Sequence, residues 1–108
     1  MATPEAKVKQ SVSKILKEHE VTYFYVPQNA YSNSAIGYPD ICAYTASGVH
    51  FTIEVKAGSN GLSPRQKIWK EKLLSLGVNY FLFRGTADDY WHGTKESRDA
   101  LIYFLESN

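Results

Sequence analysis

Cysteine is nearly absent from this sequence of 108 residues, since Cys42 is the only one. A chain with one cysteine forms no internal disulfide, which excludes the disulfide scaffolds of small secreted proteins. His19, His50 and His92 lack the spacing of zinc ligands, and no histidine–aspartate pattern lies near Cys42. We therefore expect neither a zinc site nor a cysteine nucleophile.

Long hydrophobic runs are also missing. No apolar stretch approaches the ~18 residues of a membrane span, and the first ten residues lack the apolar core of a signal peptide. We expect a soluble protein of the cytoplasm. The formal net charge is only +1, so nucleic-acid binding would have to come from a local basic face.

The sequence does have an ordinary globular composition, with 44% hydrophobic residues and no repeats or low-complexity tracts. This length and composition predict a single domain over residues 1–108. Apolar spacing, caps and turn residues predict a helix, a strand, a strand hairpin, a helix, a strand and a closing helix. The order indicates an α/β domain with a mixed sheet covered by helices. The predicted elements are helices 3–19, 63–77 and 94–107 and strands 21–26, 37–44, 51–58 and 78–84, with segment 85–93 left ambiguous. In the closing helix we expect Ala100, Leu101, Phe104 and Leu105 to point inward.

The two hairpin strands, GYPDICAY (37–44) and FTIEVKAG (51–58), carry charges where a buried strand is usually apolar. Side chains alternate along a strand, so Glu54 and Lys56 share one face. If residues 46–48 form a three-residue loop with a left-handed Gly48, Asp40 lies directly opposite Glu54 on that face. Two carboxylates this close raise each other's pKa unless a cation lies between them.

A divalent cation resolves this conflict. Mg²⁺ prefers oxygen ligands and keeps several waters, and Asp40, Glu54 and the main-chain carbonyl of Val55 supply such oxygens. Lys56 would then stand beside the metal, where its ammonium could orient a water or stabilise charge on a phosphate. The predicted chemistry is phosphodiester hydrolysis.

These residues resemble a known nuclease signature. Pro39-Asp40 followed by Glu54-Val55-Lys56 matches PD-(D/E)xK, and the wider pattern GYPDICAY, GVHFTIEVKAGSNGLSPRQKIW and LGVNYFLFR is similar to the VRR-NUC family, a branch of those nucleases. The resemblance runs from about Gly37 to Arg84, and more loosely back to Glu5. It implies a restriction-endonuclease-like core, with a mixed central sheet flanked by helices.

The resemblance also implies an Mg²⁺- or Mn²⁺-dependent DNA endonuclease. Asp40 and Glu54 would be metal ligands, Lys56 the catalytic lysine and Gln66 a helix residue near the site. Domains of this size resemble Holliday junction resolvases, which implies a homodimer acting on branched, four-way DNA in a bacterial or phage-infected cell.

Other residues have two readings. Gln66 could serve the site or only complete a capping box with Ser63. Glu5 could approach the metal through water or only complement the dipole of the first helix. Arg65, Lys67 and Lys70 could contact DNA phosphates or form a solvated helix face.

The function itself also has alternatives. The same fold could cut flaps, nicks or single strands, because shape selection depends on loops and dimer spacing. A non-catalytic DNA-binding module is a second alternative, although such a module would be expected to lack Asp40, Glu54 or Lys56. A third is a general α/β interaction domain that carries the motif by chance.

Overall fold

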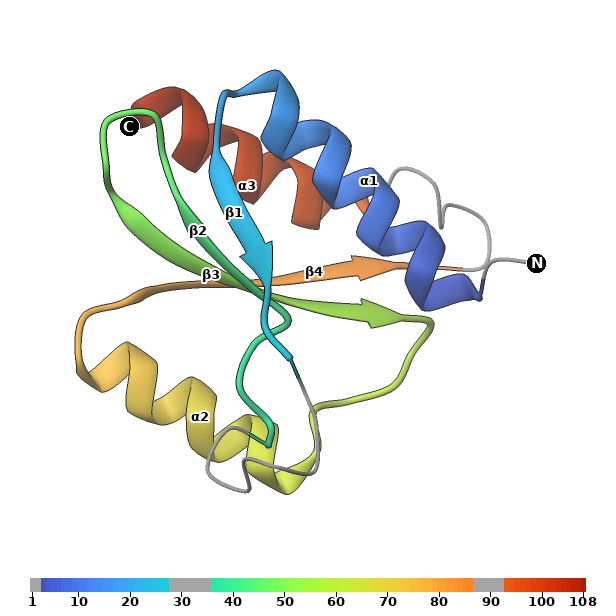
Figure 1. The fold of residues 1–108 in the computed structure, drawn as a ribbon. Coiled ribbons are helices and arrows are strands. Elements are labelled where there is room, and N and C mark those ends of the chain that lie inside the picture. The colour runs from blue at the N-terminus through green and yellow to red at the C-terminus, as the bar shows by residue number, and fades with distance from the viewer. Residues whose placement is uncertain (1–2, 28–35, 87–92) are drawn as a thin grey trace.

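The computed structural model describes residues 3–27, 36–86 and 93–108. A four-stranded sheet in the order β1-β2-β3-β4 forms its centre, and three helices cover the sheet (Figure 1). Residues 28–35, between the first two predicted strands, and residues 87–92, within the ambiguous segment 85–93, lie outside the described residues. The elements, in chain order, are α1 Pro4–Glu18, β1 Thr22–Tyr25, β2 Ile41–Tyr44, β3 His50–Ala57, α2 Pro64–Ser75, β4 Asn79–Gly85 and α3 Lys95–Ser107.

The sheet is mixed, as the sequence predicts. Strand β2 pairs antiparallel with both β1 and β3, and β4 pairs with β3 in parallel. The Thr45 N–H donates to the Val49 carbonyl at 2.9 Å, and Gly48 has φ +92°. The hairpin therefore has the predicted three-residue loop with a left-handed glycine, and its register is the predicted one.

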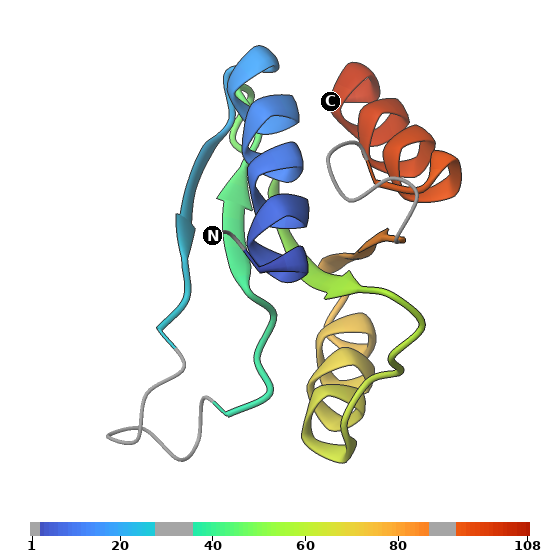
Figure 2. The same ribbon diagram turned by 90° about the vertical axis from the view of Figure 1, so that its right-hand side faces the viewer.

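The helices are divided between the two faces of the sheet. Helices α1 and α3 lie on one face and α2 lies on the other (Figures 1 and 2). The main core fills the space between the sheet and helices α1 and α3, whereas α2 buries only Leu73. The core residues of the sheet and of α1 and α3 are Val8, Val12, Ile15, Leu16, Val21, Ile41, Ala43, Phe51, Ile53, Val55, Phe83, Leu101 and Leu105.

The helix ends follow from local sequence. The Thr3 hydroxyl accepts the Ala6 N–H at 3.2 Å and caps α1, and Ser63 and Gln66 form a reciprocal capping box at the start of α2. Gly77, with φ +79°, follows the end of α2, where a left-handed residue closes the last turn.

Helix α3 differs from the prediction at one position. Leu101 and Leu105 are buried and Phe104 packs against the core, but Ala100 is exposed. Successive residues are about 100° apart around a helix, so Ala100 falls at the margin of the face that Leu101 buries. It lines a groove of about 780 Å³ between β4 and the start of α3. No helix in the described ranges is long and apolar enough to cross a bilayer.

Candidate active site

Asp40 lies immediately before β2, at the end of the hairpin away from its loop. Its Oδ2 atom accepts the main-chain N–H of Val55 at 2.8 Å. Ile41 is paired with Ile53, so the next pair outward along the two strands brings Asp40 opposite Glu54. The two carboxylates that the sequence places together therefore lie together, on the face of the sheet that carries α2.

Glu54 is a buried carboxylate within β3, with 1% of its surface exposed. Burial, the hydrogen bond with Asp40 and the charge of Asp40 raise the pKa of Glu54 to about 9, while the charge of Lys56 acts in the opposite direction. Within the described residues, no lysine or arginine nitrogen lies within ion-pair distance of Glu54. A buried carboxylate pair without a cation is unfavourable, which makes this an attractive site for one.

Lys56 follows Glu54 by two residues and shares its face of β3. The side chain is half-buried, and the parallel register places it beside Arg84 of β4. Its position next to the two carboxylates allows its ammonium to reach a group bound between them.

The donor set fits a hard divalent cation. Asp40 and Glu54 offer carboxylate oxygens, which Mg²⁺ and Mn²⁺ prefer. The part of the chain that the structure describes holds no group of three histidine, cysteine, aspartate or glutamate side chains able to share a metal. Further ligands would accordingly be main-chain carbonyls, such as that of Val55, and water.

The glycine before Pro39-Asp40 has a structural explanation. Gly37 has φ +90°, and a Cβ atom there would lie 2.7 Å from the carbonyl carbon of Arg65, in the first turn of α2. Pro39 is fully buried. The segment that carries Asp40 is thus packed directly against the start of α2. This packing fixes the position of the backbone from which the Asp40 side chain projects.

Gln66 takes the capping role. Its Oε1 atom accepts the Ser63 N–H at 2.8 Å, and its own N–H donates to the Ser63 hydroxyl at 3.2 Å. These bonds account for a glutamine at this position, and a catalytic role for Gln66 stays a prediction.

Glu5 does not point into the core with Val8 and Val12, because its side chain is exposed in the first turn of α1. Its charge nevertheless contributes to the raised pKa of Glu54, as the last of the causes. Contact of Glu5 with a metal through water stays a prediction.

The three basic residues predicted to contact DNA lie on α2. Arg65 and Lys67 are exposed, and Lys70 is half-buried with its Nζ atom 5.8 Å from the centre of the Tyr80 ring. Their contact with phosphates stays a prediction.

Two residues near the site were not singled out from the sequence. Burial and then the charges of Glu54 and Asp40 raise the pKa of Tyr80, which places its hydroxyl within electrostatic reach of the pair. Arg84 donates from Nη1 to the carbonyls of Gly58 (2.6 Å) and Asn60 (2.8 Å), and so holds the loop that follows Lys56. Alternation puts both residues on one face of β4, but only the parallel register identifies that face as the one carrying Glu54.

This chain is similar to known proteins in structure rather than in sequence. No family model matches the sequence, and no curated protein matches it. A solved structure described as a VRR_NUC domain superposes with a TM-score of 0.73 at 21% sequence identity, covering 94% of this chain and 97% of that one. The resemblance predicted from the motifs is confirmed in three dimensions, and the chain has the α/β fold of a VRR_NUC domain.

Proposed function

We propose that this protein is a metal-dependent endonuclease that hydrolyses phosphodiester bonds in branched DNA, with four-way junctions as the preferred substrate. The observation that carries the proposal is the placement of Asp40 opposite a buried Glu54, with Lys56 on the same face of β3. A fold shared with a VRR_NUC domain supports a nuclease reading of that constellation. We further propose that it acts in the cytoplasm of a bacterial or phage-infected cell.

Asp40, Glu54 and the carbonyl of Val55 would hold Mg²⁺ or Mn²⁺. When bound, such an ion supplies positive charge to the phosphate oxygens and lowers the pKa of a coordinated water. The ammonium of Lys56 would orient the attacking water and stabilise charge that develops on the phosphate. A main-chain group, the Val55 N–H, holds the Asp40 carboxylate in place.

The remaining predicted residues have supporting roles in this proposal. Glu5 would order water at the edge of the site. Gln66 would hold the start of α2, with Arg65, Lys67 and Lys70 offering charge to the DNA backbone. Because basic side chains bind phosphates by releasing counterions, binding should weaken steeply as salt rises.

A homodimer suits the proposed substrate. A four-way junction contains two symmetric strands to cut, and a two-fold dimer presents two identical sites with matching symmetry.

The test is cleavage of a panel of end-labelled DNAs in Mg²⁺, in Mn²⁺ and in EDTA. The panel contains a four-way junction, a flap, a nicked duplex, an intact duplex and a single strand. Symmetric, metal-dependent nicks in the junction are expected. Metal-dependent cutting that spares the junction would keep the site but assign the flap, nick or single-strand specificity. Well-folded protein that binds DNA and cuts none of the panel would instead identify a non-catalytic binding module.

A further inference from the structure

Among residues 3–27, 36–86 and 93–108, no helix lies over half of the α2-bearing face of the sheet. Helix α2 packs against β4, and Figure 1 draws no helix over the same face of β1 and β2. Phe24 of β1 and Tyr44 of β2 lie on this open half, and 54% and 42% of their surfaces are exposed. Exposed aromatic side chains gathered on one face are the kind of patch that marks a binding site.

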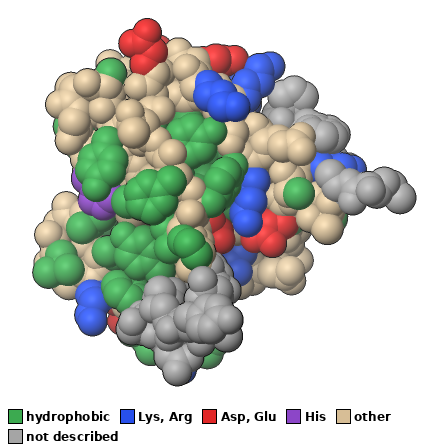
Figure 3. Space-filling model, viewed as in Figure 1, with side chains coloured by type: hydrophobic (Ala, Val, Ile, Leu, Met, Phe, Trp, Pro, Cys, Tyr) green, Lys and Arg blue, Asp and Glu red, His purple; other side chains and the backbone are tan. Residues whose placement is uncertain are grey.

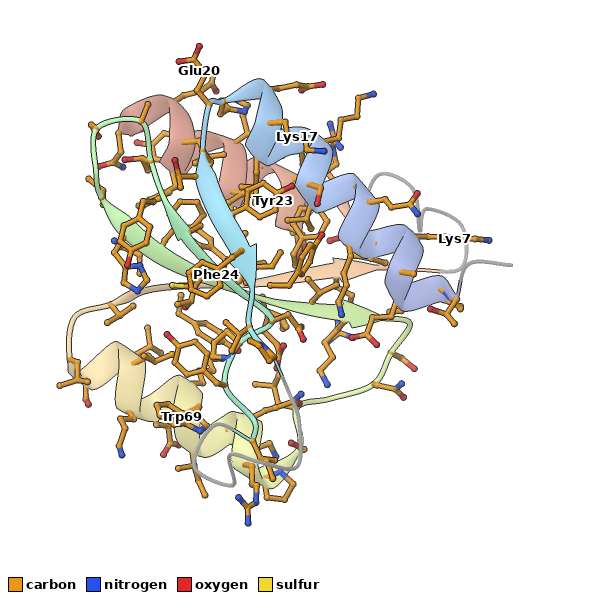
Figure 4. The ribbon with its side chains drawn as sticks, viewed as in Figure 1. Lys7, Lys17, Glu20, Tyr23, Phe24 and Trp69 are labelled. Carbon is orange, nitrogen blue, oxygen red and sulfur yellow. The ribbon has the colours of Figure 1, made fainter. Side chains whose placement is uncertain are left out.

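We call this patch the aromatic face and define it as Phe24, Tyr38, Tyr44 and Trp69. The Tyr38 and Trp69 rings meet edge to face at 5.0 Å, and Tyr44 lies against the His50 ring at 4.9 Å. Figure 3 shows hydrophobic side chains gathered in one area of this view, and Figure 4 shows Phe24 and Trp69 coming to it from the sheet and from α2.

The aromatic face adjoins the carboxylate pair. Phe24 is paired with Cys42, and Cys42 follows Asp40 by two residues on the same side of the chain. Two residues along a strand correspond to about 7 Å. A nucleotide next to a phosphate held at Asp40 and Glu54 therefore has its base within reach of Phe24.

The charges around the aromatic face indicate its ligand. None of its four residues carries a formal charge at neutral pH, whereas Lys72 lies at its border with its Nζ atom 5.3 Å from the Trp69 ring centre. A duplex backbone laid over this face would bring several phosphates to a surface whose own four residues carry no positive charge. A single nucleotide matches it better, because the base is flat and uncharged and the attached phosphate can turn toward the lysine and the metal site.

We propose that the aromatic face is a stacking platform for an unpaired nucleobase next to the scissile phosphate. This inference rests on the proposed nuclease function and deepens it, because it supplies a basis for selecting branched DNA. Continuous stacking is interrupted at a branch point, so a base there leaves the helix at lower cost than a base within a duplex. The site would therefore recognise the interrupted stacking at a branch point rather than a base sequence.

The experiment compares cleavage and binding by Phe24→Ala, Phe24→Trp and Tyr103→Ala with wild type. Tyr103 is the matched control, since it is an aromatic residue with 76% of its surface exposed on α3, at the other face of the sheet. The substrates are the four-way junction and the same junction with abasic nucleotides flanking the mapped cut. Junction affinity is also measured by anisotropy in EDTA, which reports binding to the aromatic face without any cleavage.

The platform predicts that abasic substitution lowers wild-type junction affinity and cleavage by about tenfold. Phe24→Ala should show the same loss on the intact junction and little further loss on the abasic one. Phe24→Trp should restore most of that loss, because indole also stacks on a base, and Tyr103→Ala should behave as wild type. Equal losses on both junctions for Phe24→Ala, together with conversion of a dimer to a monomer by light scattering, would overturn the proposal and assign the face to a second copy of the chain. Unchanged affinity and cleavage in Phe24→Ala would overturn it as well. If wild type cleaved neither junction but still bound the abasic junction more weakly than the intact one, the nuclease function alone would be contradicted.

Discussion

The Oδ2 atom of Asp40 accepts the main-chain N–H of Val55 at 2.8 Å, and this bond ties the residue before β2 to the middle of β3. The same carboxylate lies opposite Glu54, so one side chain both fixes the strands and forms half of the proposed metal site. The two roles can be separated, because an amide oxygen can accept the N–H but carries no charge.

Asp40→Asn should therefore fold like wild type and lose metal binding. Asp40→Ala should lose metal binding and should also be less stable than wild type. The Val55 N–H is then left without its acceptor, at a cost of about 1–3 kcal/mol. Thermal unfolding with and without Mn²⁺ measures both effects. The dual role would be contradicted if Asp40→Asn were as unstable as Asp40→Ala, or if Mn²⁺ still raised its Tm.

Glu54 should destabilise the metal-free protein at neutral and alkaline pH. Its pKa is raised to about 9 by burial and by Asp40, so folding favours its protonated form. The stability that this protonation contributes is complete at acid pH and is lost as pH rises from the ordinary glutamate range toward 9. Glu54→Gln, which is neutral at every pH, should therefore raise the Tm in EDTA at pH 8 by roughly 4–8 °C, equivalent to about 1 kcal/mol.

The matched control for this change is Glu71→Gln on α2, since Glu71 is exposed. Its Tm should stay within a degree or two of wild type at pH 5.5 and at pH 8. Metal should stabilise wild type and the Glu71 variant but not Glu54→Gln. A Glu54→Gln protein that is less stable than wild type at pH 8 would show that the buried carboxylate is satisfied without a cation.

Gly37→Ala should disturb the site from outside it. The added Cβ would lie 2.7 Å from the backbone of Arg65, at a φ of +90°, so the segment leading to Asp40 must shift. We expect a loss of at least tenfold in junction cleavage and a lower Tm. Gly61→Ala is the control, because a Cβ there meets nothing within 4 Å; equal behaviour of the two variants would argue against the close packing at Gly37.

Gln66 can be assigned by one conservative change. Glutamate also completes a capping box, so Gln66→Glu should keep stability and cleavage if the cap is the whole role, while Gln66→Ala should cost about 0.5–1 kcal/mol. Urea unfolding and junction cleavage are measured together. Full stability with a large loss of cleavage in Gln66→Glu would instead place the amide in the reaction.

The site was predictable from sequence where local rules act. Strand alternation, a short loop and a left-handed Gly48 determine the register of β2 with β3, and that register alone brings Asp40 to Glu54. The capping box of α2 is equally local, which is why Ser63 and Gln66 were found.

The rest depends on contacts between segments that are distant along the chain. The strand residues Tyr80 and Arg84 reach the site only through the parallel pairing of β4 with β3. The order of apolar and polar residues in β4 does not tell which of its two faces lies beside Glu54. The need for glycine at position 37 comes from Arg65, on a different element. The exposure of Ala100 depends on how α3 is rotated against the sheet. An alanine side chain is so small that the sequence pattern does not predict whether it is buried or exposed.

The most direct test of the whole account is single-turnover cleavage of a labelled four-way junction in Mg²⁺ by wild type, Lys56→Ala and Lys17→Ala. Lys17 is an exposed lysine in the last turn of α1, and Figure 4 shows it at the far end of that helix from Lys7. The account predicts symmetric nicks by wild type and by Lys17→Ala, and a rate at least a hundredfold lower for folded Lys56→Ala. Cleavage by Lys56→Ala at the wild-type rate would contradict it.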